Sequence, residues 1–134
     1  MNNPIKEVVK NWLQYAGEDL ELAKRELNYI DEEVLIRTVC FHCQQAVEKY
    51  LKAFLVFNEK NFRKTHDLDE IKELCLEVDS EFEKFEVGVL TLYAVESRYP
   101  NHFVVPTLAE AKEAYRLACQ VKEFILAKLK EVNE

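Results

Sequence analysis

The sequence has little of the material from which turns and sheets are built. Its 134 residues include only two glycines and three prolines. Because tight hairpin turns depend mainly on such residues, a sheet-rich fold is disfavoured and an all-α fold is favoured. The apolar fraction of 49% is still large enough to fill a hydrophobic core. A chain of this length predicts a single domain, residues 1–134.

Signals for membranes and secretion are also lacking. No apolar run approaches the length of about 20 residues that a membrane-spanning helix needs. No cleavable signal leads the chain, because its first charged residues fall within a helical pattern. The predicted location is therefore the cytoplasm. A cytosolic chain keeps its thiols reduced, so the four cysteines are not interpreted as a disulfide framework.

An excess of basic charge is missing as well. The chain has 25 acidic and 18 basic residues, which gives a formal net charge of −7 at pH 7. This balance argues against a protein coated with nucleic-acid-binding surface, although it leaves a local basic groove open.

What the sequence does contain is a long helical segment, residues 34–57, without glycine or proline. At about 100° per residue, its apolar side chains cover roughly half of the circumference. An apolar arc this wide needs several neighbours to cover it, so the segment is predicted to be the central helix. The arc consists of Ile36, Val39, Cys40, Cys43, Ala46, Val47, Tyr50, Leu51, Ala53, Phe54 and Phe57.

The remaining helices are predicted from their caps. Asn3-Pro4 opens the first helix, Asp31 precedes the central one, and capping boxes begin at Ser80 and Thr107. Pro100 bounds the helix that starts at Ser80. We therefore expect four long helices plus one short helix, arranged as an antiparallel up-and-down helix bundle. The expected ranges are 3–28, 34–59, 67–78, 80–99 and 107–131.

The most conspicuous chemical motif is Cys40-Phe41-His42-Cys43. Two thiolates one helical turn apart could bind zinc or form a redox pair. The pair lies in mid-helix on the apolar arc, however, and no second C-x-x-C supplies further ligands. We interpret both cysteines as packing residues and expect neither a metal nor a cofactor. His42 is interpreted as a residue at the edge of the core whose ring nitrogens are satisfied by neighbours.

Two side chains do not fit the helical patterns. Asp19 falls at the edge of the apolar stripe of the first helix. It is either a rim carboxylate that reaches water or the partner of a specific cation that positions a site. Phe41 falls in the polar arc of the central helix, beside Glu48 and Lys52, which suggests a surface covered by another subunit.

The loop 98–102 is a candidate for phosphate chemistry. The guanidinium of Arg98 matches the geometry of phosphate oxygens. His102 can accept or donate a proton near neutral pH, as cleavage by an RNA 2′-hydroxyl requires. The alternative is that Arg98 caps a helix and that His102 is an ordinary loop residue. Tyr99 and Asn101 are candidate contacts of RNA or of a nucleotide.

The connection before the short helix at residues 67–78 is a second candidate site for RNA or a nucleotide. The N–H groups of a helix N-terminus can bind phosphate. The cationic side chains of the connection are Lys60, Arg63, Lys64 and His66. Arg63 and Lys64 are taken as candidate RNA or nucleotide contacts. Asp67 and Asp69 compete for the same helix end, so a solvated loop is the alternative.

Several segments together resemble the HEPN domain. They are WLQYAGEDLELAKREL, FHCQQAVEKYLKAFL, THDLDEIKEL and SRYPNH, followed by an alanine-rich last helix. The resemblance extends from about Trp12 to Leu129. It implies a bundle of four or five helices that is commonly homodimeric. It also implies a minimal nucleotidyltransferase as partner, in a toxin–antitoxin pair encoded by adjacent genes.

The resemblance also implies an activity. HEPN ribonucleases cut RNA without metal at a site shared across the dimer, using an arginine and a histidine separated by four to six residues. Here Arg98 and His102 have three residues between them, and Tyr99 stands where a small polar residue is usual. Two functions follow: a metal-independent endoribonuclease, or an inert module that binds a nucleotide or its partner. Arg37 and His42 have four residues between them and so match the family's spacing. On a helix, however, their directions diverge by about 140°, so we interpret this match as accidental.

Overall fold

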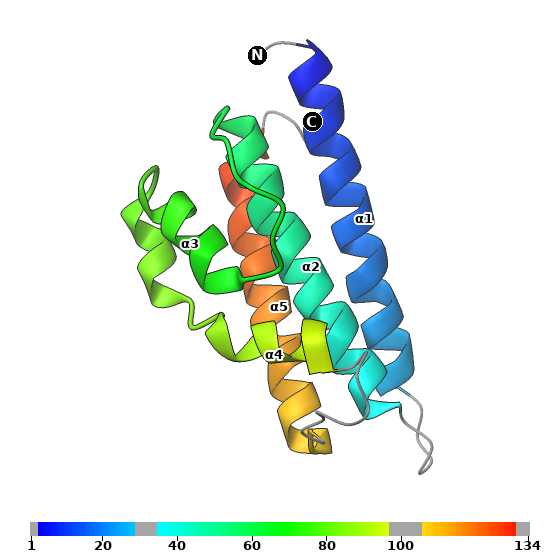
Figure 1. Ribbon diagram of the computed structural model, residues 1–134. Coiled ribbons are helices and arrows are strands. Elements are labelled where there is room, and N and C mark those ends of the chain that lie inside the picture. Colours follow the sequence, from blue (N-terminus) through cyan, green and yellow to red (C-terminus); the bar gives the residue numbers. More distant parts are fainter. Residues whose placement is uncertain (1–2, 29–34, 97–105, 131–134) are drawn as a thin grey trace.

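The computed structural model describes residues 3–28, 35–96 and 106–130, and these residues contain helices and connections but no strand. Three long helices lie side by side (Figure 1): α1 (Asn3–Leu27), α2 (Ile36–Phe57) and α5 (Leu108–Lys128). Three short elements connect α2 to α5: α3 (Leu68–Leu76), the 3-10 helix η1 (Ser80–Lys84) and α4 (Gly88–Glu96). The predicted all-α class is confirmed. No helix in these ranges is long and apolar enough to cross a membrane.

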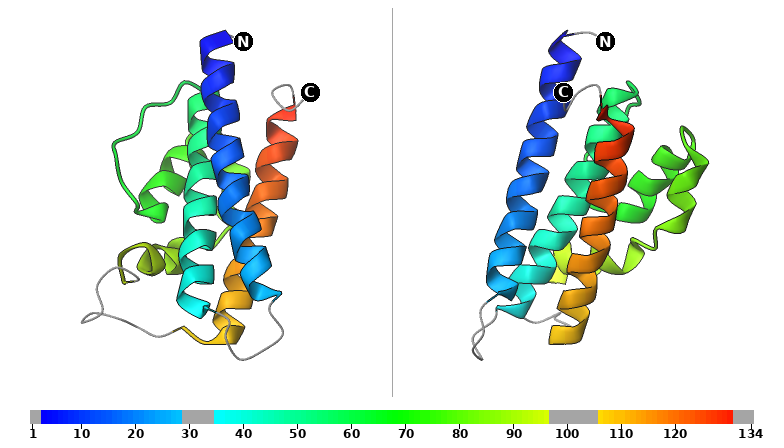
Figure 2. Two further views of the ribbon diagram at one scale, coloured as in Figure 1. Left: turned by 90° about the vertical axis from the view of Figure 1, so that its right-hand side faces the viewer. Right: turned by 180° about the vertical axis from the view of Figure 1, so that it is seen from behind.

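The direction of the helices differs in one respect from a simple up-and-down order. α1 runs antiparallel to α2 and α5, whereas α2 and α5 run in the same direction (Figure 2). This is because the connection after α2, together with α3, η1 and α4, brings the chain back to the end of the bundle where α2 began (Figure 1). The short elements therefore stand where a fourth long helix was expected.

α2 is the centre of the fold, as its wide apolar arc predicts. It packs against α1, α3, α4 and α5, and its buried side chains span the helix from Val39 to Leu55. α3 is joined to α2 by Cys75, whose thiol donates to the carbonyl oxygen of Leu51 at 3.8 Å. An apolar arc of this width is stable only because four elements remove it from water.

The helix expected over residues 80–99 is interrupted. η1 ends at Lys84, its C-cap Phe85 has extended backbone angles (φ −97°, ψ 120°), and α4 begins only at Gly88. The break allows both phenylalanines of η1 and its C-cap to be buried. Phe82 packs against Phe54 and Phe124 with ring centroids 4.7 and 4.9 Å apart, and Phe85 packs against Phe124 at 5.2 Å. Burial of aromatic surface outweighs helix continuity here.

One of the two predicted capping boxes is confirmed. The Thr107 hydroxyl accepts from the N–H of Glu110 at 3.1 Å, and the Glu110 carboxylate accepts from the N–H of Thr107 at 2.9 Å. The other prediction is wrong. Asp79 caps η1 in place of Ser80, because its carboxylate accepts from the N–H of Glu81 at 2.9 Å.

The start of α2 is held by α1. Asp31, the predicted cap, lies outside the described residues. The N–H of Leu35 donates instead to the carboxylate of Glu26 at 2.8 Å, and this bond satisfies one of the free donors at the helix N-terminus.

Candidate functional site

One face of α2 is polar and nevertheless buried. Gln44, Glu48 and Lys52 follow one another at intervals of four residues, with side chains in contact along the helix. Gln44 donates to Glu48 Oε1 and Lys52 donates to Glu48 Oε2, both at 3.1 Å. Buried charged groups are stable only when paired, and this carboxylate and ammonium neutralise each other.

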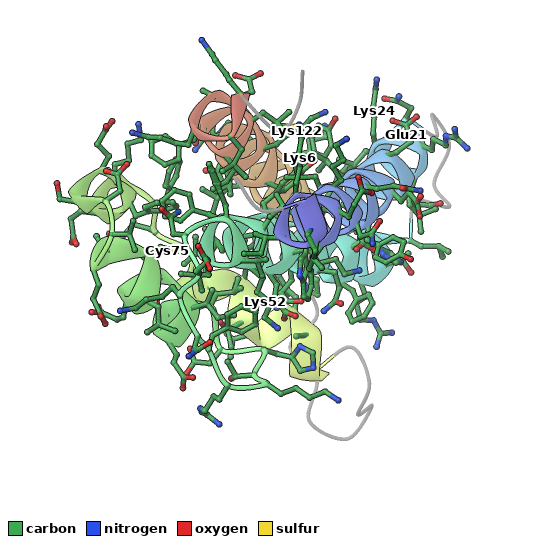
Figure 3. The ribbon with its side chains drawn as sticks, turned by 90° about the horizontal axis from the view of Figure 1, so that it is seen from above. Lys6, Glu21, Lys24, Lys52, Cys75 and Lys122 are labelled. Carbon is green, nitrogen blue, oxygen red and sulfur yellow. The ribbon has the colours of Figure 1, made fainter. Side chains whose placement is uncertain are left out.

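The connection between α2 and α3 covers this polar row. The Lys52 ammonium donates to the carbonyl oxygen of Thr65 at 3.1 Å, and Gln44 donates to that of His66 at 3.4 Å. The rings of Phe62 and Trp12 lie 5.6 and 5.8 Å from the same ammonium. Figure 3 shows Lys52 on the side of α2 that faces this connection. The sequence places Glu48 and Lys52 on a polar arc, and the structure shows what lies over it.

His66 is anchored on this row. Its Nδ1 lies 2.8 Å from Glu48 Oε1, and the Glu48 side chain is only 5% exposed whereas that of His66 is 48% exposed. A carboxylate paired with an ammonium only accepts hydrogen bonds, so Nδ1 of His66 is the donor. The tautomer is thereby set, and Nε2 is the ring nitrogen left for another partner.

A second polar group joins α1 to α2. Asp19 Oδ1 lies 2.8 Å from Nδ1 of His42, and Asp19 Oδ2 lies 2.5 Å from Nζ of Lys49. All three side chains are partly buried. Of the two interpretations of Asp19, the structure agrees with a partner for a specific cation. The interpretation of His42 is confirmed for one ring nitrogen, because Asp19 satisfies its Nδ1, and the ring packs edge-on against Phe41 at 5.1 Å.

The cysteines of the C-x-x-C motif are packing residues, as interpreted. Cys40 and Cys43 are free thiols with no exposed surface. Burial raises the pKa of Cys40 to about 11, and it raises the pKa of Cys43 further. Both sulfurs are therefore protonated at neutral pH, which opposes nucleophilic or redox chemistry. Within the described ranges, no group of three or more His, Cys, Asp or Glu side chains could hold a metal ion.

The comparisons with known proteins agree with this architecture. The family model of the HEPN domain matches residues 9–131, nearly the whole chain. The chain belongs to the HEPN family. The crystal structure of TT1696 from Thermus thermophilus is similar, with 25% sequence identity and a TM-score of 0.69 over 90% of this chain and 98% of that one. No curated protein matches the sequence.

The polar groups of this HEPN protein lie within the segments that carry the resemblance. Glu48 and Lys52 belong to FHCQQAVEKYLKAFL, and His66 belongs to THDLDEIKEL. Sequence reasoning named these residues separately and missed the link between Glu48 and His66. The spacing of four residues from Gln44 to Glu48 to Lys52 predicts that these three share one face of the helix, but it gives no signal for His66.

The predicted catalytic loop lies outside the described residues. Its members are Arg98, Tyr99, Asn101 and His102. The helix that precedes this loop, α4, is joined to the start of α3, because the Thr91 hydroxyl of α4 accepts from the N–H of Leu68 at 3.0 Å. α4 is thus fastened to the residue two positions after His66.

The second predicted contact, at Arg63 and Lys64, is partly occupied. Arg63 forms a two-pronged ion pair with Glu70 at 2.6 and 2.7 Å. The N-terminus of α3 is filled by Asp67, whose carboxylate accepts from the N–H groups of Asp69 and Glu70. Lys64 is exposed and has no ion-pair partner within the described ranges. The helix end therefore fits the alternative of a solvated loop, and binding of RNA or a nucleotide by Arg63 and Lys64 stays a prediction.

Proposed function

We propose that this protein is the HEPN component of a nucleotidyltransferase-associated, toxin–antitoxin-like system and that it cuts RNA without a metal ion. The observation that carries the proposal is the family match over residues 9–131, in a chain that has Arg98 and His102 between α4 and α5. Cytoplasmic location is part of the same proposal.

In the proposed reaction the RNA 2′-oxygen attacks the neighbouring phosphorus, and the bond to the 5′-oxygen breaks to leave a 2′,3′-cyclic phosphate. Arg98 stabilises the negative charge that builds up on the phosphate oxygens. His102 transfers a proton as general acid or base. Tyr99 and Asn101 contact the nucleotide, and Arg63 and Lys64 hold the RNA backbone further along.

The test is cleavage of bulk RNA by purified protein in the presence of EDTA. We expect Arg98→Ala and His102→Ala each to slow cleavage by about 10²- to 10³-fold, which is the usual effect of losing one charge-stabilising or proton-transfer group. Arg116→Ala is the matched control, since it removes an exposed arginine whose ion pair in the described ranges is with Glu113 on α5. Absence of cleavage by the wild type at micromolar concentration would overturn the enzyme proposal.

The alternative is an inert HEPN module that binds a nucleotide or its protein partner. One argument for it is that two basic side chains of the connection after α2 already have acidic partners. Arg63 is paired with Glu70 and Lys60 with Glu77, both at 2.6 Å, which leaves less positive charge for RNA. The three-residue spacing of Arg98 and His102 favours it too. This alternative predicts that a nucleotide raises the melting temperature while RNA stays intact.

We further propose a homodimer in which α4 takes part. This helix is largely apolar on every side: Leu90 and Ala94 are buried, but Val89 and Leu92 are 57% and 50% exposed. A helix without a polar face is usually covered all round. Because the loop with Arg98 follows α4 directly, pairing through α4 would bring the two loops close to each other.

Analytical ultracentrifugation tests the dimer. We expect the double variant Val89→Ser, Leu92→Ser to shift the protein to monomer, whereas Leu22→Ser, at a 45% exposed position on α1, leaves the dimer intact. A dimer unaffected by the double variant would overturn the role of α4. The nucleotidyltransferase partner is tested by co-expression with the product of the neighbouring gene, followed by co-purification.

A further inference from the structure

A pocket of about 520 Å³ lies where the segment after α3 meets α5. Its lining combines two aromatic rings with an ammonium, an amide and a carboxylate, from Lys84, Phe85, Gln120, Glu123 and Phe124. The volume falls within the ~300–1,000 Å³ that ligand-binding pockets have. Glu123 is exposed and has no ion-pair partner among the residues that the structure describes. The pocket therefore offers a carboxylate beside aromatic surface.

The aromatic rings of this pocket already attract cations. The Lys84 ammonium lies 4.5 Å from the ring centroid of Phe124 and 5.4 Å from that of Phe85. The Lys128 ammonium lies 5.2 Å from the ring centroid of Phe124. These are cation–π distances. Two carboxylates hold Lys128 at 2.8 Å, whereas Lys84 is exposed and forms no ion pair in the described ranges, so another cation can displace it.

The pocket adjoins the part of the chain that carries the net charge. Residues 67–86, which we call the acidic arm, contain nine acidic and two basic residues and have a net charge of −7. The rest of the chain contains 16 residues of each sign and is neutral overall. A charge imbalance confined to one segment produces a local field that attracts partners of the opposite sign.

The acidic arm comprises α3, η1 and the residues next to them. It lies on the side of α2 and α5 away from α1 (Figure 1), and the view from behind in Figure 2 shows the same order. Basic side chains from elsewhere in the chain neutralise part of the arm, namely those of Lys60, Arg63 and Lys128. Other carboxylates of the arm are exposed and have no ion-pair partner in the described ranges, among them Glu73, Glu83 and Glu86.

We propose that this pocket is a docking site for an arginine side chain on a basic segment of a protein partner. The guanidinium replaces the Lys84 ammonium on Phe124 and pairs with the Glu123 carboxylate. Arginine fits better than lysine, because its planar guanidinium stacks on a ring and donates to several acceptors at once, including the amide oxygen of Gln120. The inference goes beyond the proposed function and does not depend on RNA cleavage.

Charge determines the class of the occupant. The phosphates of RNA or of a nucleotide would meet the carboxylates of Glu83, Glu86 and Glu123, and like charges repel. A second copy of this chain is neutral outside its own acidic arm, so it supplies no matching positive field. A basic protein segment is attracted by the whole arm, while the pocket selects the side chain that enters it.

The test measures binding of a fluorescently labelled peptide of alternating arginine and alanine by anisotropy. We expect Glu123→Gln to weaken binding by about 5- to 10-fold, since the guanidinium loses its carboxylate in the pocket. Glu113→Gln is the matched control, because it removes the same charge from an exposed position on the same helix. It should weaken binding by less than about 2-fold. Melting temperatures check that both variants fold.

Lys84 gives a test in the opposite direction. Because its ammonium competes with the guanidinium for the rings, we expect Lys84→Ala to tighten peptide binding by about 3-fold more than Lys112→Ala does. Lys112 is the control because it is exposed on α5 and carries the same charge. A peptide with lysine in place of each arginine should bind the wild type about 3-fold more weakly.

The results that overturn the proposal are distinct. Equal effects of Glu123→Gln and Glu113→Gln would mean that the peptide is attracted to the arm without entering the pocket. Binding of a labelled RNA oligonucleotide that Lys84→Ala weakens more than Lys112→Ala would assign the pocket to nucleic acid. A loss of self-association in Glu123→Gln, measured by ultracentrifugation, would assign it to a contact between copies. Failure of the RNA cleavage assay leaves this inference standing.

Discussion

Asp19 joins α1 to α2 through both of its carboxylate oxygens. One oxygen accepts from His42 and the other from Lys49, and the Asp19 side chain is only 12% exposed. An exposed ion pair contributes little to stability, but a pair withdrawn from water is costly to break because one charge stays behind without a partner. The contact is therefore expected to matter for folding.

We predict that Asp19→Asn lowers the free energy of unfolding by about 1–3 kcal/mol, because Lys49 loses its counter-ion in a partly buried position. Urea denaturation followed by circular dichroism measures the change. Glu18→Gln is the control, since Glu18 is exposed and, among the residues that the structure describes, accepts from Gln14. An equal effect of the two substitutions would contradict the prediction.

The thiols give a second prediction for single residues. Cys40 and Cys43 are fully buried with raised pKa values, whereas Cys119 is half-buried. Since only an accessible thiolate reacts, we expect an alkylating reagent at pH 8 to modify Cys119 first and to modify the C-x-x-C pair only after urea is added. Peptide mass spectrometry identifies the modified residue. Rapid labelling of Cys43 in the folded protein would contradict the packing interpretation.

Among the elements, the segment from η1 to α4 departs most from its sequence pattern. A capping box and an apolar stripe predict one helix there, yet Phe85 is extended and α4 starts at Gly88. In a continuous helix Phe82 and Phe85 would be tied to one face at a fixed spacing. The break lets both rings pack against Phe124 of α5. Tertiary packing decides the local structure in this segment.

We predict that Phe82→Ala lowers the free energy of unfolding by about 3–5 kcal/mol, because it leaves a cavity between α2 and α5. Val78→Ala, at a 41% exposed position, should change it by less than about 0.5 kcal/mol. Thermal and urea denaturation of both variants test this. Similar stabilities would mean that η1 is not part of the cooperative core.

For the whole molecule, the buried acids determine how stability changes at high pH. Burial raises the pKa of Cys40 to about 11, and the pKa values of Cys75 and Tyr50 to about 12. Their ordinary values are 9.0 for cysteine and 10.0 for tyrosine. A raised pKa means that the folded state keeps its proton where the unfolded state loses it. This stabilisation is complete below pH 9 and is lost as the pH rises through the folded values.

We therefore predict that the unfolding free energy falls between pH 9 and 11, with each buried thiol adding up to about 1.4 kcal/mol per pH unit to the slope. Urea midpoints measured at several pH values under reducing conditions test this. Cys75→Ala should make the slope shallower. A midpoint that stays constant up to pH 11 would contradict the prediction.

The candidate site was predictable only in pieces. The helical pattern puts Gln44, Glu48 and Lys52 on one face, and Asp19 at the edge of another. It does not say that the connection after α2 folds back over this face and brings His66 to Glu48. That approach depends on residues 18 positions apart, which no local rule relates.

The sequence by itself determined the all-α class, the central position of α2, the capping box at Thr107 and membership of the HEPN family. The first three follow from the direction of each side chain around its own helix and from local hydrogen bonds, which nearby residues control. The family follows from the resemblance of whole segments, which the family model confirms over residues 9–131. The tertiary structure alone decided the burial of Glu48 and Lys52, the bridge at Asp19 and the break at Phe85. Each of these depends on which distant segment covers a given face, and therefore on how the whole chain packs.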